Sequence, residues 1–405
     1  MKNLFILNNC ETSKMNGIGT FIEQLTELFG NNLNFDVNIV DLYSDSQTFC
    51  ISKKRYANHI LFPRFEYGVC LNKINRVVDT FFKLYIADNE NNIFIYNESP
   101  CSDLIKKVKL SHPKSKHIYI FHNMGWTYYF KGDVYAFKES FISPNEPSIH
   151  ISSIYKEETE ICKQADCIIC LCEDTKEILL TSYSVDFTKI RCINNGINIK
   201  IDEHKDSTNI RNYLNVSPNE IILLFVGRLE HLKGAFELIN AFKKVATKIS
   251  NCQLIMVGPI QNQEELQNKI YPYSSRIRLT GILQKEELNN WYKISDIGII
   301  PSYTEQCSYV GLEMLAHGLP IICSDGFGLR NMFGKEFDQA TAKICDRKFP
   351  EQFTNNLASK IEEFILSKQI REHYSKMSSQ LFHNKYTATI MRDQYLSLFE
   401  ELTEN

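Results

Sequence analysis

Residues 301–322, PSYTEQCSYVGLEMLAHGLPII, lie between two apolar runs that each read as a β-strand. The first run, residues 296–300, ends at a proline, and the second begins at residue 321. Between them, an apolar stripe at helical spacing predicts a helix that carries Leu312, Leu315 and Ala316. A strand, a polar loop, a helix and a strand in this order predict one turn of a doubly wound α/β domain. In such domains ligands bind at the carboxyl ends of the strands.

Two carboxylates stand out in this stretch. Glu305 lies in the predicted loop, and Glu313 lies about one turn inside the predicted helix. They flank the helix N-terminus, where backbone N–H groups favour anionic ligands. The stretch therefore predicts a ligand site with two carboxylates beside a set of N–H donors.

The bulk composition sets outer limits on the class of protein. The chain has 405 residues, of which 43% are hydrophobic, so it can form two domains or one large one. A formal charge of -3 gives no indication of nucleic acid as a partner. Thirteen scattered cysteines are typical of a reducing compartment. The N-terminus reads as a strand and no apolar run approaches about 20 residues, so we expect a cytoplasmic protein.

The N-terminal half begins with a predicted strand, Lys2 to Leu7, and a polar loop that ends in Gly17-Ile18-Gly19. Glycines between a strand and a helix let a ligand approach the backbone closely, although the same pattern also forms ordinary turns. Residues 45–70 read as irregular. Strands and helices then alternate as far as His122, which directly follows the predicted strand His117 to Phe121.

His122 and the aromatic run after it each have two interpretations. A histidine just past a buried strand is either a functional group or a hydrogen-bonded structural residue. The run from Trp126 to Phe141 is rich in aromatic residues and belongs either to the core or to an acceptor pocket. The core is the favoured interpretation of the run.

Two other clusters have a plain interpretation and a functional one. Cys167, Cys170 and Cys172 lie on a predicted strand, and we interpret them as buried thiols rather than metal ligands, because no second cluster has ligand spacing. Lysines gather around the predicted helix Ser102 to Leu110. They indicate either a solvated helix end, which we favour, or a contact with anionic lipid at a membrane surface.

The C-terminal half places two cations in one loop. Arg228 and Lys233 follow the predicted strand Ile221 to Val226 and precede a predicted helix. Two cations near a helix N-terminus suit a diphosphate, and carboxylates such as Glu305 and Glu313 can accept hydrogen bonds from sugar hydroxyls. Together they favour a sugar-nucleotide site. The alternative is that the cations are surface charges and both glutamates cap helices.

The same residues carry a family resemblance. Residues 225–234, FVGRLEHLKG, resemble the phosphate loop of the retaining glycosyltransferases of family 4. Residues 301–305, Glu313 and the sequence HGLP at 317–320 resemble that family's paired-glutamate signature. The resemblance covers nearly the whole chain, is strongest over 221–324, and extends to bacterial glycosyltransferases found beside peptide-modification genes.

The resemblance implies a fold and a domain organisation. The fold is GT-B, an α/β architecture of two Rossmann-like doubly wound parallel-sheet domains that face each other across a cleft. Residues 1–199 would form an N-terminal acceptor-side domain, and residues 200–382 the donor-binding domain. A final helix at about 383–405 would cross back onto the first domain.

The resemblance also implies residue roles. Glu305 and His122 would lie at the reacting sugar, and Glu313 would bind the nucleotide ribose. The other donor-binding residues would contact the diphosphate or the sugar, in part through backbone groups: Gly17, Gly19, Arg228, Lys233, Gln306, Cys307, Ser308, Tyr309 and Val310. No metal or other cofactor is expected.

The expected function is a retaining hexosyltransferase. It would move a sugar from a nucleoside-diphosphate sugar, a UDP-sugar first and a GDP-sugar second, to a hydroxyl of a glycan, lipid or peptide by a same-face mechanism. Two alternatives are a sugar phosphorylase on the same fold and a non-catalytic partner subunit of another glycosyltransferase. The retained charged residues argue against the partner subunit.

Overall fold

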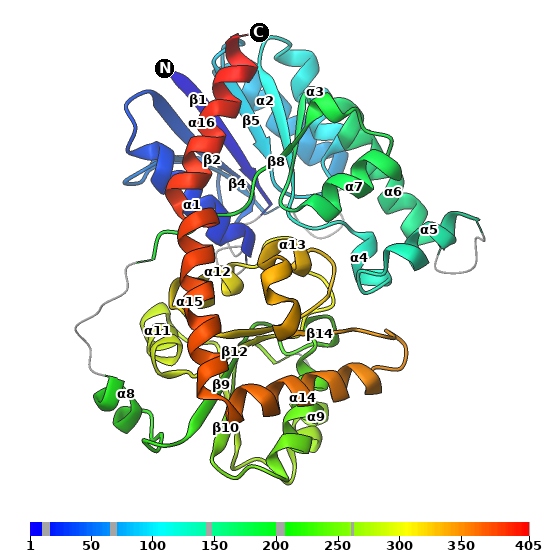
Figure 1. Ribbon diagram of the computed structural model, residues 1–405. Helices are drawn as coiled ribbons and strands as arrows, with labels where there is room; N and C mark the ends of the chain where they lie inside the picture. Colours follow the sequence, from blue (N-terminus) through cyan, green and yellow to red (C-terminus); the bar gives the residue numbers. More distant parts are fainter. Residues whose placement is uncertain (10–16, 65–70, 143–147, 200–206, 261–262, 405) are drawn as a thin grey trace. The chain divides into compact units, whose positions relative to one another are not determined.

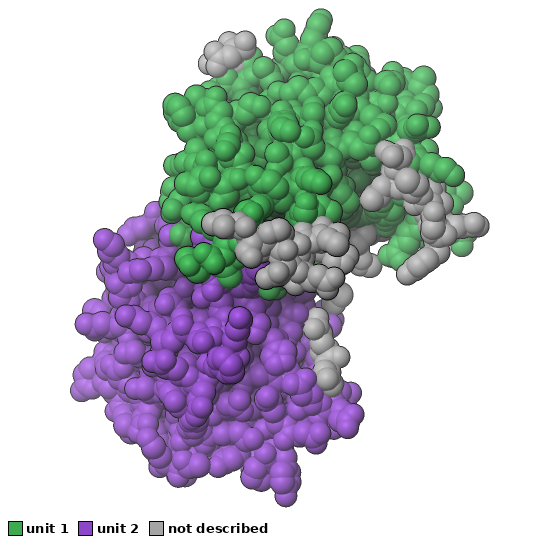
Figure 2. All heavy atoms as spheres, turned by 90° about the vertical axis from the view of Figure 1, so that its right-hand side faces the viewer, with its two compact units in different colours: residues 1–129, 135–196, 388–405 green, residues 130–134, 197–387 purple. Residues whose placement is uncertain are grey.

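The computed structural model describes residues 1–9, 17–64, 71–142, 148–199, 207–260 and 263–404. Contacts divide the chain into two compact units, which Figure 2 shows in different colours. Unit 1 contains residues 1–129, 135–196 and 388–405, and unit 2 contains residues 130–134 and 197–387. Each unit is an α/β domain built on a largely parallel sheet, which confirms the expected fold class.

Unit 1 is built on an eight-stranded sheet in the described residues, in the order β3-β4-β2-β1-β5-β6-β7-β8. Only the edge pair β3–β4 is antiparallel. Central strands such as β5 are buried along their whole length, as expected for a parallel sheet covered on both faces. The strands are β1 (Lys2–Asn8), β2 (Phe35–Ser44), β3 (Cys50–Lys53), β4 (Asn58–Pro63), β5 (Asn92–Tyr96), β6 (Lys116–Phe121), β7 (Cys167–Cys170) and β8 (Ile190–Cys192).

Helices flank this sheet (Figure 1). They are α1 (Gly17–Gly30), α2 (Leu71–Tyr85), α3 (Ser102–Ser111), α4 (Trp126–Tyr129), α5 (Val134–Ile142), α6 (Ser148–Gln164), α7 (Glu173–Thr181) and α16 (Ala388–Glu404), with a short 3-10 helix at Phe187–Lys189. The C-terminal helix α16 packs against α1 and is therefore part of the core of unit 1. On its buried side, Phe399 lies against Phe29 with 5.4 Å between the ring centroids.

Two local expectations in this unit were wrong. Residues 50–53 and 58–63, which the sequence left irregular, form β3 and β4 at the edge of the sheet. Short edge strands have little of the continuous apolar character that identifies central ones. The expected strand through Cys172 ends at Cys170, and Cys172 is the N-cap of α7.

Unit 2 is built on a six-stranded sheet in the described residues, in the order β11-β10-β9-β12-β13-β14. All of its strand pairs among the described residues are parallel. The strands are β9 (Ile221–Val226), β10 (Cys252–Val257), β11 (Ile277–Gly281), β12 (Ile297–Ile300), β13 (Ile321–Ser324) and β14 (Thr341–Ala342). The chain reverses direction across the sheet between β9 and β12, which is where such sheets bind ligands.

The helices of unit 2 connect these strands. They are α8 (Ser207–Tyr213), α9 (Ala235–Ala246), α10 (Gln263–Ile270), α11 (Lys285–Ile294), α12 (Tyr309–Ala316), α13 (Leu329–Phe333), α14 (Glu351–Leu366) and α15 (Lys368–Lys385), with 3-10 helices at His231–Lys233 and Lys335–Ala340. On α9 the predicted apolar stripe is buried: Phe236, Ile239, Phe242 and Val245.

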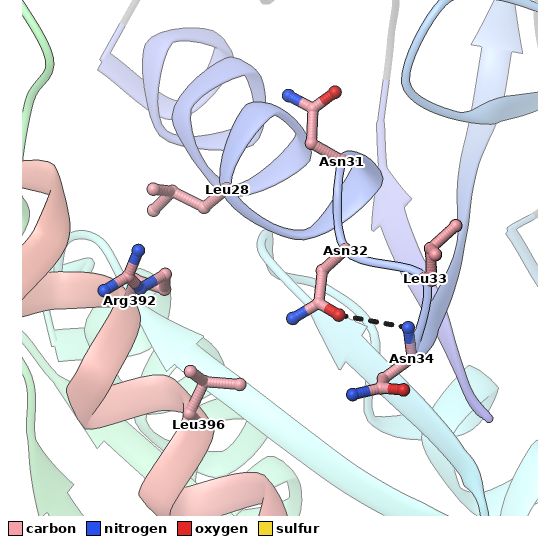
Figure 3. A pocket seen from close by; sticks show the side chains of 7 residues that line it. All are labelled: Leu28, Asn31, Asn32, Leu33, Asn34, Arg392 and Leu396. Atoms are coloured by element: carbon pink, nitrogen blue, oxygen red, sulfur yellow. Dashed lines mark hydrogen bonds between the residues drawn. The ribbon is translucent and has the colours of Figure 1, made fainter.

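An open pocket in unit 1 lies where α16 meets the C-terminal end of α1 (Figure 3). Among its lining residues only Arg392 carries a charge. Asn34 closes one side of it by donating its backbone N–H to the Oδ1 of Asn32 at 3.0 Å. The pocket lies at the opposite end of α1 from Gly17, and so at the other edge of the sheet from His122.

Candidate functional site

In unit 2, the loop after β9 presents the two predicted cations differently. The Arg228 guanidinium is 44% exposed and lies 2.9 Å from the Glu230 carboxylate. Lys233 ends a short 3-10 helix, and its side chain is only 23% exposed. Gly234 follows at φ 67° and is the N-cap of α9. A Cβ at Gly234 would lie 2.1 Å from the carbonyl oxygen of Pro301, so only glycine lets the two loops approach this closely.

Lys233 and Glu305 meet across these two loops. The Lys233 Nζ lies 2.5 Å from the Glu305 Oε1. The Ser302 hydroxyl donates to the same oxygen at 2.9 Å. The Glu305 side chain is 14% exposed, and these two donors hold its carboxylate in one position. The structure thus brings together two residues that are 72 positions apart and that the sequence assigned to one site.

The segment after Glu305 leads into α12. Ser308 is the N-cap of this helix, and its hydroxyl accepts a hydrogen bond from the Gly311 N–H at 3.3 Å. Tyr309 and Val310 are the first helical residues, so their N–H groups precede the first N–H that bonds to a carbonyl oxygen of this helix, that of Leu312. Cys307 is buried beside them. The backbone here is therefore arranged as a helix N-terminus suited to an anion.

Gln306 is unusual within this segment. Its side chain is 5% exposed, yet neither its amide oxygen nor its amide nitrogen has a hydrogen-bond partner among the described residues. Buried amides in native proteins are nearly always paired, because an unpaired one loses its hydration without compensation. A buried, unpaired amide next to Glu305 is therefore a candidate contact for a ligand.

Glu313 has a different environment from Glu305. Its Oε2 accepts a hydrogen bond from the Tyr292 hydroxyl at 2.6 Å. Burial raises the pKa of Glu313, while the Tyr292 hydrogen bond acts in the opposite direction. Tyr292 in turn stacks on His317 at 5.0 Å, and the His317 Nδ1 lies 2.8 Å from the Glu313 carbonyl oxygen. The Glu313 carboxylate is therefore held at the α12–α11 contact.

In unit 1, His122 lies just past the end of β6, as expected. Its Nε2 lies 2.9 Å from the Asn97 Oδ1, and the Asn97 amide donates to the Leu7 carbonyl oxygen at 3.0 Å. The Phe21 ring packs edge-on against the imidazole at 4.8 Å. Burial lowers the pKa of His122 to about 3, so the imidazole is neutral at pH 7. A neutral imidazole acts as a hydrogen-bonding group rather than as a cation.

Gly17 and Gly19 lie inside α1 rather than in a loop ahead of it. The helix begins at Gly17, so both glycines are in its first turn, and Gly19 is buried. The preceding residues, 10–16, lie outside the described part of the chain. The predicted site residues are divided between the two units. Unit 1 contains Gly17, Gly19 and His122, and unit 2 contains the others.

The aromatic run from Trp126 to Phe141 has both a buried and an exposed part. Trp126 and Phe137 are at most 1% exposed and stack with 4.6 Å between their ring centroids. In contrast, Tyr128, Tyr129 and Tyr135 are exposed, the last by 74%. The core interpretation therefore holds for one face of the segment only, and the other face presents tyrosines to solvent.

Three side chains of these clusters were missed by sequence reasoning. Asn97 directly follows β5 and Ser302 lies two residues after the end of β12, positions whose polar residues could have been flagged. Tyr292 lies inside α11 and had no signal in the sequence. Its role depends on a contact between two helices.

Cys167, Cys170 and Cys172 are all buried. In the part of the chain that the structure describes, no group of three or more His, Cys, Asp or Glu residues could hold a metal ion. Two of the lysines around α3 form ion pairs, Lys107 with Asp103 and Lys109 with Asp166. No helix among the described residues is long and apolar enough to span a membrane.

Comparison with known proteins agrees with this geometry. Residues 206–380 match the family model described as Glycosyl transferases group 1. This part of the chain is therefore similar to the domains of that family. The matched region contains both loops with Lys233 and Glu305, as well as Glu313. The matches confirm the expected enzyme class of the domain.

Curated relatives match part of the chain. An uncharacterized glycosyltransferase of Methanocaldococcus jannaschii is 29% identical over 175 residues, 42% of this chain and 45% of that protein. A lipopolysaccharide 1,2-N-acetylglucosaminetransferase of Salmonella typhimurium is 28% identical over 215 residues, 48% of this chain and 56% of that protein. The chain thus matches these relatives over about half of their length.

Solved structures match the whole fold. Sucrose-phosphate synthase of Thermosynechococcus elongatus superposes with a TM-score of 0.76 at 18% identity and covers 99% of both chains. Anabaena HepE, solved with UDP and glucose, gives a TM-score of 0.73 at 13% identity, with 99% of this chain and 100% of that chain covered. At such identities the likeness establishes the fold alone, the two-domain α/β fold of GT-B glycosyltransferases.

Proposed function

We propose that this protein is a retaining glycosyltransferase of family 4 that transfers a hexose from a nucleoside-diphosphate sugar to a hydroxyl group. The observation that carries the proposal is the contact of Lys233, Ser302 and Glu305 at the carboxyl ends of β9 and β12. A cation at this edge can bind the diphosphate of such a donor, and a fixed carboxylate can bind the hydroxyls of its sugar.

Each residue then has a stated task. Arg228, Lys233 and the N-terminus of α12 bind the diphosphate and stabilise its charge as it leaves. Glu305 accepts hydrogen bonds from the sugar hydroxyls, and Lys233 keeps its carboxylate oriented. Glu313, held by Tyr292, accepts hydrogen bonds from the ribose. We also propose neutral His122 as a hydrogen-bonding group for the sugar.

In the proposed same-face reaction, the bond between the anomeric carbon and the diphosphate oxygen breaks as the acceptor oxygen approaches from the same side. The departing diphosphate takes the acceptor's proton. The new glycosidic bond forms with the configuration retained. We further propose a UDP-sugar donor first and a GDP-sugar second, and an acceptor on a glycan, lipid or peptide. The exposed tyrosines of α4 and α5 are the proposed acceptor surface.

The test is a panel of UDP-, GDP- and ADP-sugars, measured for binding by thermal shift and for slow donor hydrolysis. We expect one base to raise the melting temperature, since a ligand that binds only the folded state stabilises it. Glu305→Gln and Lys233→Ala should lower hydrolysis by about 100-fold. Lys248→Ala is the matched control, because Lys248 forms an exposed pair with Glu362 in the same unit and should behave as wild type.

Other outcomes separate the alternatives. No binding and no turnover with any of these donors would contradict the proposal. Formation of a sugar 1-phosphate from a disaccharide and inorganic phosphate, with no nucleotide required, would indicate a phosphorylase instead. Donor binding without any turnover, across a broad acceptor panel, would indicate a non-catalytic subunit.

A further inference from the structure

A tight turn interrupts the aromatic segment between α4 and α5. The Asp133 N–H donates to the Phe130 carbonyl oxygen at 2.8 Å. The two central residues, Lys131 and Gly132, have φ values of 47° and 69°. Two successive positive φ values with this hydrogen bond are the pattern of a type I′ turn. A lysine in this conformation is strained, and such strain persists only where surrounding contacts hold it in place.

Those contacts lie within unit 2. Residues 130–134 belong to unit 2 although the chain on either side belongs to unit 1. A Cβ at Gly132 would lie 2.7 Å from the Tyr303 carbonyl oxygen and 3.2 Å from the Thr304 Cβ, so the turn touches the backbone of this loop directly. The Lys131 ammonium lies 5.3 Å from the centroid of the Tyr303 ring. The turn thus packs on the two residues that precede Glu305.

Arg347 fastens the turn in this position. Its Nε donates to the Lys131 carbonyl oxygen at 3.0 Å, and the Lys131 Nζ donates to the Arg347 carbonyl oxygen at 3.2 Å. Its guanidinium also lies 3.6 Å from the Asp133 carboxylate. The Arg347 side chain is 24% exposed. These three contacts join the segment after β14 to the turn, and none of them involves a residue assigned to the donor site.

The loop beneath the turn is itself built from backbone hydrogen bonds. The Tyr303 N–H donates to the Leu232 carbonyl oxygen at 2.9 Å, one residue before Lys233. The Glu305 N–H donates to the Phe327 carbonyl oxygen at 2.9 Å. Backbone hydrogen bonds therefore hold Tyr303 and Glu305 to two neighbouring loops. The turn covers Thr304, which lies between these two residues.

We propose that Arg347, acting through the Phe130–Asp133 turn, is a positioning residue that fixes the Ser302–Glu305 loop for sugar transfer. The inference rests on the function proposed above, because it assigns Glu305 to the donor sugar. Arg347 does not itself touch the donor in this scheme. Glu313 and Arg228 are held by other contacts, and Lys233 pairs with the Glu305 side chain, so loss of the Arg347 contacts affects the placement of the sugar more than the affinity for the nucleotide.

The experiment compares Arg347→Ala with wild type in two measurements on the full chain. In amide hydrogen exchange, the Tyr303 and Glu305 amides should exchange about tenfold faster in the variant. In donor turnover, kcat should fall about tenfold, because a small displacement of a reacting group is costly, while the donor KM changes less than twofold. Arg347→Lys keeps the charge opposite Asp133 and should restore part of both.

Arg371→Ala is the matched control. Arg371 also donates to backbone carbonyl oxygens of unit 2, those of Phe364 and Ile365, but at the corner between α14 and α15. It should leave loop exchange and kcat unchanged. If Arg347→Ala does not fold, Gly132→Ala takes its place, since its added Cβ would push directly on the Tyr303 carbonyl oxygen.

Three results would overturn the inference. They are unchanged exchange at Tyr303 and Glu305, faster exchange throughout unit 2, and a loss of kcat that Arg371→Ala reproduces. The exchange measurement needs no substrate. If wild type turns over no donor, the proposed function fails. Faster exchange confined to the Ser302–Glu305 loop in Arg347→Ala would still show that Arg347 holds this loop in place.

Discussion

At the scale of single residues, Gln306 offers the sharpest test of the donor-sugar site. Its buried amide has no hydrogen-bond partner among the described residues. Gln306→Leu removes polar atoms that nothing in the described protein satisfies, so we expect the free energy of unfolding to stay constant or rise by up to about 1 kcal/mol. If the amide binds a sugar hydroxyl, kcat/KM for the donor should fall about tenfold.

Chemical denaturation and donor kinetics on the same preparation measure the stability and the kcat/KM of Gln306→Leu. A variant that loses stability shows instead that the amide is paired in solution. A stable variant with unchanged donor kinetics shows that Gln306 lies outside the sugar site. Thr304→Val, one position before the carboxylate, serves as a control for a neighbouring polar side chain.

Tyr292 tests the second carboxylate. Tyr292→Phe removes the hydrogen bond to the Glu313 Oε2, which is 2.6 Å long, and leaves that oxygen without this donor. We expect the donor KM to rise about fivefold at nearly constant kcat, with about 1 kcal/mol of lost stability, because one hydrogen bond orients a ground-state binding group.

Tyr395→Phe is a matched control for this change. Tyr395 is also fully buried, but its hydroxyl has no hydrogen-bond partner among the described residues. The control should keep or gain stability and leave donor kinetics alone. Equal effects of both substitutions would show that the Tyr292 result reports on packing and not on Glu313.

At the scale of secondary-structure elements, α6 supports the turn that follows His122. The buried Glu158 carboxylate accepts the Gly125 N–H at 2.8 Å and is also hydrogen-bonded to the Tyr183 hydroxyl. Burial raises the pKa of Glu158 to about 7, against 4.5 for an ordinary glutamate, although both hydrogen bonds act to lower it. A raised pKa means that the folded state favours the protonated carboxyl.

The stabilising contribution of Glu158 is therefore complete below pH 4.5 and is lost as the pH rises through 7. From pH 5 to pH 8 we expect wild type to lose up to about 3 kcal/mol through this group, and Glu158→Gln to show a correspondingly flatter profile. Denaturation at several pH values measures this. Glu160→Gln, on the exposed side of the same helix, should keep the wild-type slope.

Element by element, the sequence predicted the central strands well but missed the edge pair β3 and β4. β9 was predicted at its observed bounds, because six consecutive apolar residues between polar loops have few other interpretations. β3 and β4 were missed because edge strands depend on pairing with each other and with β2. The Lys233–Glu305 contact could be inferred from loop position, whereas Tyr292 required the packing of α11 on α12.

At the scale of the whole molecule, the last helix completes unit 1. Deletion of residues 388–405 would remove four large buried side chains of α16: Met391, Tyr395, Leu398 and Phe399. At about 1.5–3 kcal/mol each, their burial contributes about 6–12 kcal/mol, which is comparable to the total stability of a domain. We therefore expect unit 1 to unfold in the truncated protein.

Limited proteolysis with mass spectrometry would locate the unfolding, with cleavage expected within residues 1–196 first. Arg392→Ala, at the exposed rim of the pocket in Figure 3, is the control and should melt as wild type. A truncated chain whose unit 1 resists protease as well as the full chain would show that α16 is dispensable.

The two-unit architecture could be anticipated from alternating strands and helices and from the resemblance. The contact of Gly132 with Tyr303 could not, because 171 positions separate the two residues and nothing in the sequence Lys131-Gly132 indicates a partner. The sequence shows that a turn can form at a glycine, but only the packed structure shows what it touches.

That turn has a consequence for how such proteins can be recombined. Five residues of unit 2 are encoded in the middle of unit 1, at 130–134. A chimaera that exchanges residues 197–387 for the equivalent part of another glycosyltransferase would retain its host's turn and pair it with a foreign loop. The two units therefore cannot be exchanged as independent segments of sequence. We expect substitutions to be correlated among residues 130–134, 303–304 and 347.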